Sequence, residues 1–161
     1  MRRGAPLILT LVTVAVLLLD RGIKLYVVEW LGLMNGTGPI EVAPPYLRLI
    51  MGWNTGINFG LFDGGAAQQR WILIGIAVVV SIGLAIWALR AGGRLIPVAC
   101  GLIIGGALGN AWDRITYGAV ADFLNMSCCG IDNPFVFNVA DTAIFLGAVA
   151  LILMPSKGQK A

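Results

Sequence analysis

The chain has 161 residues, of which 58% are hydrophobic and 12% charged, and its mean hydropathy is +0.88. This composition excludes an ordinary soluble domain and is typical of a protein embedded in a bilayer. The formal net charge is +3, but the basic residues are scattered and form no basic patch interleaved with aromatics, which excludes a nucleic-acid partner. At about 20 residues per membrane span, the length suits a single domain, 1–161, with four spans.

The first apolar segment predicts a spanning helix over about 7–28 that is retained, because Asp20 interrupts the run and no small-residue cleavage site follows. Residues 31–70 are rich in Gly, Pro and Asn. They contain two strand-like stretches, Tyr46–Trp53 and Ile57–Phe62, so we expect a small β-sheet outside the membrane.

The next two spans are expected over about 71–89 and 95–112, joined by a basic turn at 90–94. Gly101, Gly105 and Gly109 recur every four residues in the third span, which predicts close packing against a neighbouring helix. A polar loop, 113–136, separates it from a fourth span over about 137–154. The predicted fold is therefore an all-α membrane core of four transmembrane helices with a small extracytoplasmic sheet between the first two.

Charge asymmetry predicts the orientation. The side that holds both termini and the 90–94 turn carries six basic residues and no acid, whereas the other side, with the span ends that face it, carries five basic residues and all eight acids. By the positive-inside rule, both termini are cytoplasmic and the loops 31–70 and 113–136 face outward.

Two pairs of ionisable residues are candidates for chemistry. Asp20 and Lys24 are four apart on one helix, so they can form an ion pair that is either structural or catalytic. Asp122 follows the third span and Asp141 lies in the first turn of the fourth, so both carboxylates come to the outer membrane interface, where they could approach each other. Two close carboxylates share a proton, which is how aspartic proteases activate water. Alternatively, they cap helices and pair with Arg114, or they relay protons.

Other chemistry has little support. The chain has no His, and its three cysteines (Cys100, Cys128 and Cys129) have no CxxC spacing. This removes Ser-His-Asp and Cys-His catalysis and His-ligated metals, and it favours neither zinc nor a redox motif. Because paired carboxylates and a water molecule suffice for hydrolysis, we expect neither a metal nor a cofactor.

Five blocks carry a family resemblance. In chain order they are 20–24 (DRGIK), 54–59 (NTGINF), 105–114 (GGALGNAWDR), 120–123 (VADF) and 137–141 (FNVAD). Together they resemble the lipoprotein signal peptidases, also called signal peptidase II, over nearly the whole chain. One departure is Asn58, where the family usually has a small residue.

The resemblance implies an aspartic endopeptidase of the bacterial inner membrane that removes the signal peptide of diacylglyceryl-modified prolipoproteins just before the lipidated cysteine. Its active site would face the periplasm, beneath a lid-like segment within 31–70. Asp122 and Asp141 match the catalytic pair. The matching substrate-binding or supporting residues are Asp20, Lys24, Asn54, Gly56, Asn110, Asp113, Arg114 and Asn138.

The expected partners are the lipid-modified substrate and membrane lipids, and we expect a monomer. The competing function is a small proton-coupled transporter that uses the same acidic residues as a relay. Four spans without an inverted repeat or broken helices argue against it.

Overall fold

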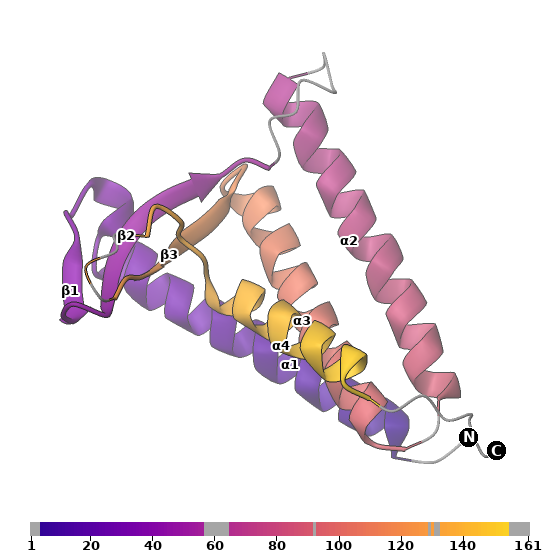
Figure 1. Ribbon diagram of the computed structural model, residues 1–161. Coiled ribbons are helices and arrows are strands. Elements are labelled where there is room, and N and C mark those ends of the chain that lie inside the picture. Colours follow the sequence, from indigo (N-terminus) through magenta and orange to yellow (C-terminus); the bar gives the residue numbers. More distant parts are fainter. Residues whose placement is uncertain (1–3, 57–64, 92, 129, 131–132, 155–161) are drawn as a thin grey trace.

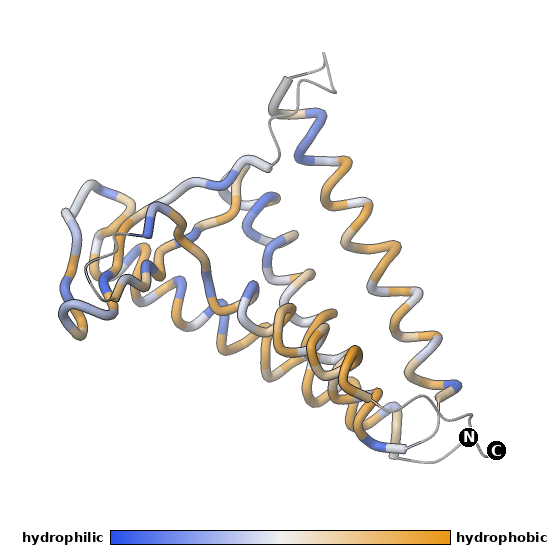
Figure 2. The backbone as a smooth tube through the Cα atoms, in the orientation of Figure 1, coloured by the Kyte–Doolittle hydropathy of each residue, from blue (hydrophilic) through white to orange (hydrophobic). Residues whose placement is uncertain are grey.

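The computed structural model describes residues 4–56, 65–91, 93–128, 130 and 133–154. Within these residues, helices α1 (Ala5–Lys24), α2 (Gly65–Arg90), α3 (Leu95–Thr116) and α4 (Val139–Ile152) form the core, and an antiparallel sheet lies at one end of it. Figure 1 shows that α2 lies near the other helices at its C-terminal end and moves away from them toward its N-terminal end. The helices are mostly hydrophobic along their length, and hydrophilic positions gather in the sheet and at helix ends (Figure 2).

Helix α3 is central, since it packs against α1, α2 and α4. The predicted glycine stripe makes this packing close. A Cβ added at Gly105 would lie 2.6 Å from the Val16 Cβ of α1, and one added at Gly101 would lie 2.8 Å from that of Val12. Any side chain at these positions would force α1 and α3 apart, which confirms the packing role expected of the stripe.

The predicted spans agree with the described helices to different degrees. Helix α1 continues through a π-helical segment, η1 (Leu25–Trp30), and so covers the first predicted span. Helix α2 begins several residues before its predicted span, because a polar turn extends the apolar helix. Among the described residues, three helices are long and apolar enough to cross a bilayer, whereas α4 has 14 residues. Its length of about 21 Å is less than the roughly 30 Å of a hydrocarbon core.

The sheet corrects the predicted loops. Its strands are β1 (Ile40–Ala43), β2 (Leu47–Asn54) and β3 (Val120–Met126), in that spatial order. Strand β2 confirms the first strand-like stretch, but β3 comes from the segment that we predicted as a polar loop. Strand β3 is buried along most of its length, so it lacks the alternation that identifies a half-exposed strand. Helix α3 also extends four residues into that predicted loop.

The sheet is fastened to the helical core by apolar side chains. Val28 of η1 packs with Leu33, with Leu49 of β2, and with Ala121 and Phe123 of β3. Strand β3 is thereby fixed against the segment that follows the C-terminal end of α1, with Asp122 opposite Gly52 of β2.

Part of the first loop cannot be compared with expectation. The second strand-like stretch, 57–62, and Asn58 lie outside the described residues, as does much of the expected lid-like segment. Among residues 31–56, the helical piece is a short 3-10 turn, η2 (Leu33–Asn35).

Candidate active site

Asp122 and Asp141, hereafter the dyad, reach the site from different elements. Asp122 lies in the middle of β3, and Asp141 lies in the first turn of α4. The N-cap of α4 is Asn138, whose side chain accepts a hydrogen bond from the Asp141 backbone N at 2.9 Å. In return, Asp141 Oδ2 accepts from the Asn138 backbone N at 3.2 Å. This capping box stabilises the helix start and orients the Asp141 carboxylate, so the expectation that an aspartate caps a helix is correct for Asp141.

Two buried amides connect the dyad carboxylates. Asn138 Nδ2 donates to Asp122 Oδ1 at 2.7 Å and to Asn110 Oδ1 at 3.1 Å. Asn110 Nδ2 donates in turn to Asp141 Oδ1 at 2.7 Å. Asn138 is completely buried and Asp122 is 3% exposed, whereas Asp141 is half-buried. The family resemblance predicted that Asn110 and Asn138 lie around the dyad. The structure adds that their amides link the Asp122 carboxyl to that of Asp141.

Asn54 approaches Asp122 from the end of β2. Its side-chain oxygen accepts from the Gly56 backbone N at 3.0 Å, and its amide hydrogen-bonds to Asp122. Gly56 has a φ of +116°, a conformation that L side chains rarely adopt. Glycine therefore permits the turn that aims the Asn54 amide at Asp122.

Burial and the neighbouring negative charge of Asp141 raise the pKa of Asp122 to about 6. Hydrogen bonds from Asn54 and Asn138, together with the positive charge of Lys24, oppose this rise in pKa. Desolvation is the largest cause, because a buried carboxylate loses hydration that a neutral carboxyl does not need. The Asp122 carboxyl therefore holds its proton to a higher pH than an exposed carboxyl does.

Four charged side chains form an ion cluster beneath the dyad: Asp20, Arg21 and Lys24 of α1 and Asp113 of α3. The predicted pair is present, with Lys24 Nζ 2.9 Å from Asp20 Oδ2. Lys24 Nζ also lies 2.6 Å from Asp113 Oδ2, and Arg21 pairs with Asp113 as well. The expectation of an isolated pair is thus incomplete. Arg21 was missed, although it lies next to Asp20 within the first family block.

Arg114 does not pair with the dyad. In the part of the chain that the structure describes, no carboxylate lies within ion-pair distance of its guanidinium, and its Nη1 donates weakly to the Asn110 carbonyl at 3.4 Å. Its Nε has no hydrogen-bond partner among the described residues. Among the described residues the aspartates thus form no direct ion pair with Arg114, although the negative charges of Asp141 and Asp122 act on its guanidinium. This guanidinium has donors available beside the dyad.

An apolar groove of about 390 Å³ adjoins the dyad. It is lined by Asp141 and Thr142 together with Met126, Phe137 and Phe145. Phe145 and Met126 are exposed, so the groove opens on the side of the protein that faces away from the core. An apolar chain lying in it would pass beside the Asp141 carboxylate.

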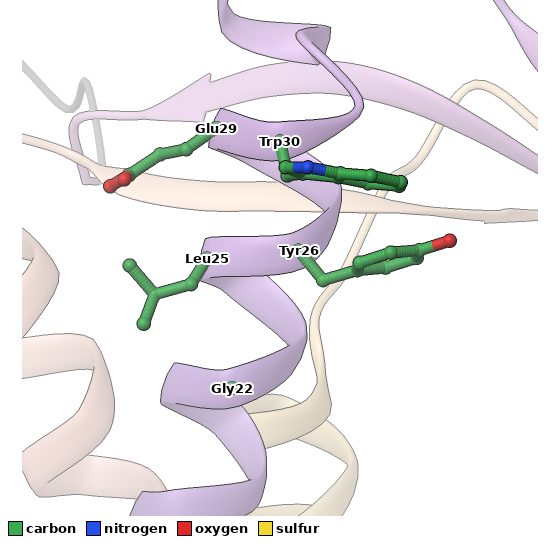
Figure 3. A pocket seen from close by; sticks show the side chains of 5 residues that line it. All are labelled: Gly22, Leu25, Tyr26, Glu29 and Trp30. Atoms are coloured by element: carbon green, nitrogen blue, oxygen red, sulfur yellow. The ribbon is translucent and has the colours of Figure 1, made fainter.

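A second hollow lies at the C-terminal end of α1 and is lined by Gly22, Leu25, Tyr26, Glu29 and Trp30. Figure 3 shows Tyr26 and Trp30 stacked on one side of the helix and Leu25 and Glu29 on the other. The ring centroids are 5.1 Å apart. Exposed aromatic rings at the end of an apolar helix are typical of the membrane–water interface, and none of these five residues was a predicted site residue.

The described ranges contain no group of three or more His, Cys, Asp or Glu that could hold a metal ion. The dyad oxygens instead accept hydrogen bonds from side-chain amides and a backbone N.

Apolar helices long enough to cross a bilayer, together with two carboxyl groups linked through side-chain amides, fit the class of membrane enzymes. A solved structure described as a bacterial membrane enzyme has the same fold, with a TM-score of 0.76 and 26% identity over 94% of each chain. A second such structure has a TM-score of 0.74 and 25% identity, again over 94% of each chain.

The chain belongs to the signal peptidase (SPase) II family, whose model matches residues 12–156. A lipoprotein signal peptidase of Methylorubrum extorquens (strain PA1) is 45% identical over 86% of this chain and 80% of its own length. One from Methylobacterium sp. (strain 4-46) is 42% identical over 92% and 88%, respectively. These similarities confirm the family resemblance, and they give no support to a transporter.

Proposed function

We propose that this protein is an aspartic endopeptidase of the bacterial inner membrane that removes the signal peptide from diacylglyceryl-modified prolipoproteins, cutting just before the lipidated cysteine. Family membership supports the peptidase activity and the class of substrate. The observation that carries the aspartic mechanism is the joining of Asp122 and Asp141 through the buried amides of Asn138 and Asn110. The desolvated Asp122 carboxyl, with its raised pKa and its amide link to Asp141, is suited to hold a single proton.

The singly protonated dyad supplies both functions that peptide hydrolysis needs. The ionised aspartate takes a proton from a water molecule, whose oxygen attacks the scissile carbonyl carbon. The protonated aspartate polarises that carbonyl, and a proton then passes to the leaving amine nitrogen as the C–N bond breaks. The available donors of Arg114 are suited to bind a substrate carbonyl, and the supporting amides hold the dyad in place.

The same proposal includes four spans, with α4 as the fourth, in a single peptidase domain that works as a monomer. Asp20 lies about 22 Å along α1 from Ala5, and its carboxylate contacts the start of α4. The dyad would therefore lie near the outer limit of the hydrocarbon core. With the termini in the cytoplasm, this is the periplasmic side, where a lipid-anchored precursor enters laterally through the apolar groove beside Asp141.

The test is cleavage of a lipid-modified precursor by the purified protein in phospholipid nanodiscs. Asp122→Asn and Asp141→Asn should each abolish cleavage, because an amide can neither accept the proton of water nor return it. The double variant should be no worse than either single variant, as expected of groups that act as one unit. The matched control is Glu41→Gln, an exposed carboxyl on β1, which should cleave normally. More than a few per cent of wild-type turnover in either Asn variant would reject the two-aspartate mechanism.

A further inference from the structure

The contacts of the ion cluster extend to the backbone that carries the dyad. Asp20 Oδ1 accepts a hydrogen bond from the Ala140 backbone N of α4 at 3.2 Å. Asp113 Oδ2 accepts one from the Ala121 backbone N of β3, also at 3.2 Å. Ala140 and Ala121 are the residues immediately before the two dyad aspartates. Each dyad aspartate thus follows a residue whose backbone N–H is bound by the cluster: Asp20 binds that of Ala140, and Asp113 binds that of Ala121.

Lys24 connects the two carboxylates that make these backbone hydrogen bonds. Its Nζ lies 2.9 Å from Asp20 Oδ2 and 2.6 Å from Asp113 Oδ2, and all three side chains have an exposed fraction of 0%. Arg21 also pairs with Asp113, but its Nε is 4.0 Å from Asp20 and its side chain is 18% exposed. In the described part of the chain, Lys24 is therefore the fully buried cation that draws both carboxylates to one atom.

The helix packing gives Asp20 access to α4. Asp20 belongs to α1, and its carboxylate passes Gly109 of α3 on the way to Ala140. A Cβ added at Gly109 would lie 2.8 Å from Asp20 Oδ2 and 3.6 Å from the Ala140 Cβ. The absence of a side chain at this position thus leaves the space in which the Asp20 carboxylate reaches the backbone of α4.

We propose that Lys24 is a positioning residue for the peptidase reaction: by holding Asp20 and Asp113 on one nitrogen, it fixes the separation of the two peptide units that carry the dyad. This inference rests on the proposed function. The physical requirement is strict, because catalytic groups must be held within about 0.5 Å of their productive geometry. Strand β3 and helix α4 are separate elements, and the cluster provides a common support for both.

A purely structural role is the competing explanation, because removing one member of a buried ion pair leaves an uncompensated charge and destabilises the fold. A charge-balanced double variant separates the two roles. Lys24→Met combined with Asp20→Asn removes one positive and one negative charge and preserves much of the side-chain volume. The Asn oxygen still accepts from the Ala140 N–H, and the Arg21–Asp113 pair remains. The variant loses only the connection through Lys24 between the side chains at positions 20 and 113.

We expect this double variant to fold, with a thermal midpoint near that of the wild type and an unchanged KM. Its kcat should fall on the order of tenfold to a hundredfold, as small misplacements of catalytic groups do. A second charge-balanced variant, Lys24→Met with Asp113→Asn, tests the link from the β3 side and should behave alike. Tyr117→Phe, which removes the 2.7 Å hydrogen bond to Glu29 at the same end of the molecule, is the control and should change neither constant.

Either double variant, if folded with wild-type kcat, would overturn the positioning role. Failure of both to yield folded protein would assign Lys24 to folding alone and would overturn it as well. The proposed function is judged separately in the same assay: the peptidase activity is rejected if the wild-type protein leaves the lipid-modified precursor uncut, and the two-aspartate mechanism is rejected if Asp122→Asn or Asp141→Asn still cleaves it.

Discussion

Replacement of Asp122 by asparagine should make the protein more stable while it abolishes cleavage. The pKa of the Asp122 carboxyl rises from an ordinary value of 3.8 to about 6 in the folded protein, chiefly through burial. The folded state therefore binds this proton more tightly than the unfolded state does. The free energy of unfolding consequently falls as pH rises from about 3.8 to about 6, and it stays low above that range. A neutral amide removes this penalty.

The magnitude follows from the difference in pKa. At 1.36 kcal/mol per pKa unit, the ionised Asp122 carboxylate lowers the free energy of unfolding by about 3 kcal/mol at pH 7.5. At pH 4.5, Asp122 is protonated in the folded protein but mostly ionised in the unfolded chain. The same relation then lowers the free energy of unfolding by about 1 kcal/mol. The amide also loses part of the hydrogen bonding from Asn54 and Asn138, worth about 1 kcal/mol. The expected net gain in stability is therefore about 2 kcal/mol at pH 7.5 and close to zero at pH 4.5.

The measurement is thermal unfolding of both proteins in detergent, followed by fluorescence of the five tryptophans, at the two pH values. Comparing the variant with the wild type at each pH removes the contribution of all other titrating groups. Glu41→Gln is the control, because its exposed carboxyl should give no pH-dependent difference. The argument is refuted if Asp122→Asn is less stable than the wild type at pH 7.5, or if the difference in stability is the same at both pH values.

Three further predictions concern the substrate, the orientation and the helix packing. Cleavage should require the lipid on the substrate cysteine, because the groove beside Asp141 is apolar and opens away from the core; equal rates with an unlipidated precursor would contradict this. Reporter domains fused within the 90–94 turn and at the C-terminus should report cytoplasm, and one at residue 130 should report periplasm; a periplasmic signal from the turn would reverse the orientation. Gly109→Ala should lower the free energy of unfolding by about 1–3 kcal/mol and reduce cleavage, since the added methyl displaces the Asp20 carboxylate. Gly83→Ala, on an open face of α2, should change neither quantity.

Local features of the site were predictable. The spacing of Asp20 and Lys24 places them on one helix face, and they pair at 2.9 Å. Asn138 and Asp141 have the spacing of a capping box, and they form one. These contacts lie within one helical turn, so the sequence spacing determines which side chains meet.

Contacts between distant segments were not predictable in the same way. Strand β3 pairs with β2, about 70 residues earlier, and its burial hides the alternation by which a strand is identified. Lys24 meets Asp113 across two helices, and no spacing rule indicates that pairing. The amide bridge through Asn138 and Asn110 likewise depends on how α3 and α4 pack.

The sequence by itself determined that the chain is a membrane protein with apolar helices, a close-packed glycine stripe and an acidic side, because each of these depends on composition or on helical periodicity. The five sequence blocks that resemble the family led to the proposal that Asp122 and Asp141 are the catalytic pair. Only the tertiary structure decided that Asp122 sits on a buried strand, that two amides join it to Asp141, and that one lysine links the supports of both. The physical reason is that helix hydrogen bonds close within four residues, whereas sheet pairing and buried ion clusters join segments that only the packed chain brings together.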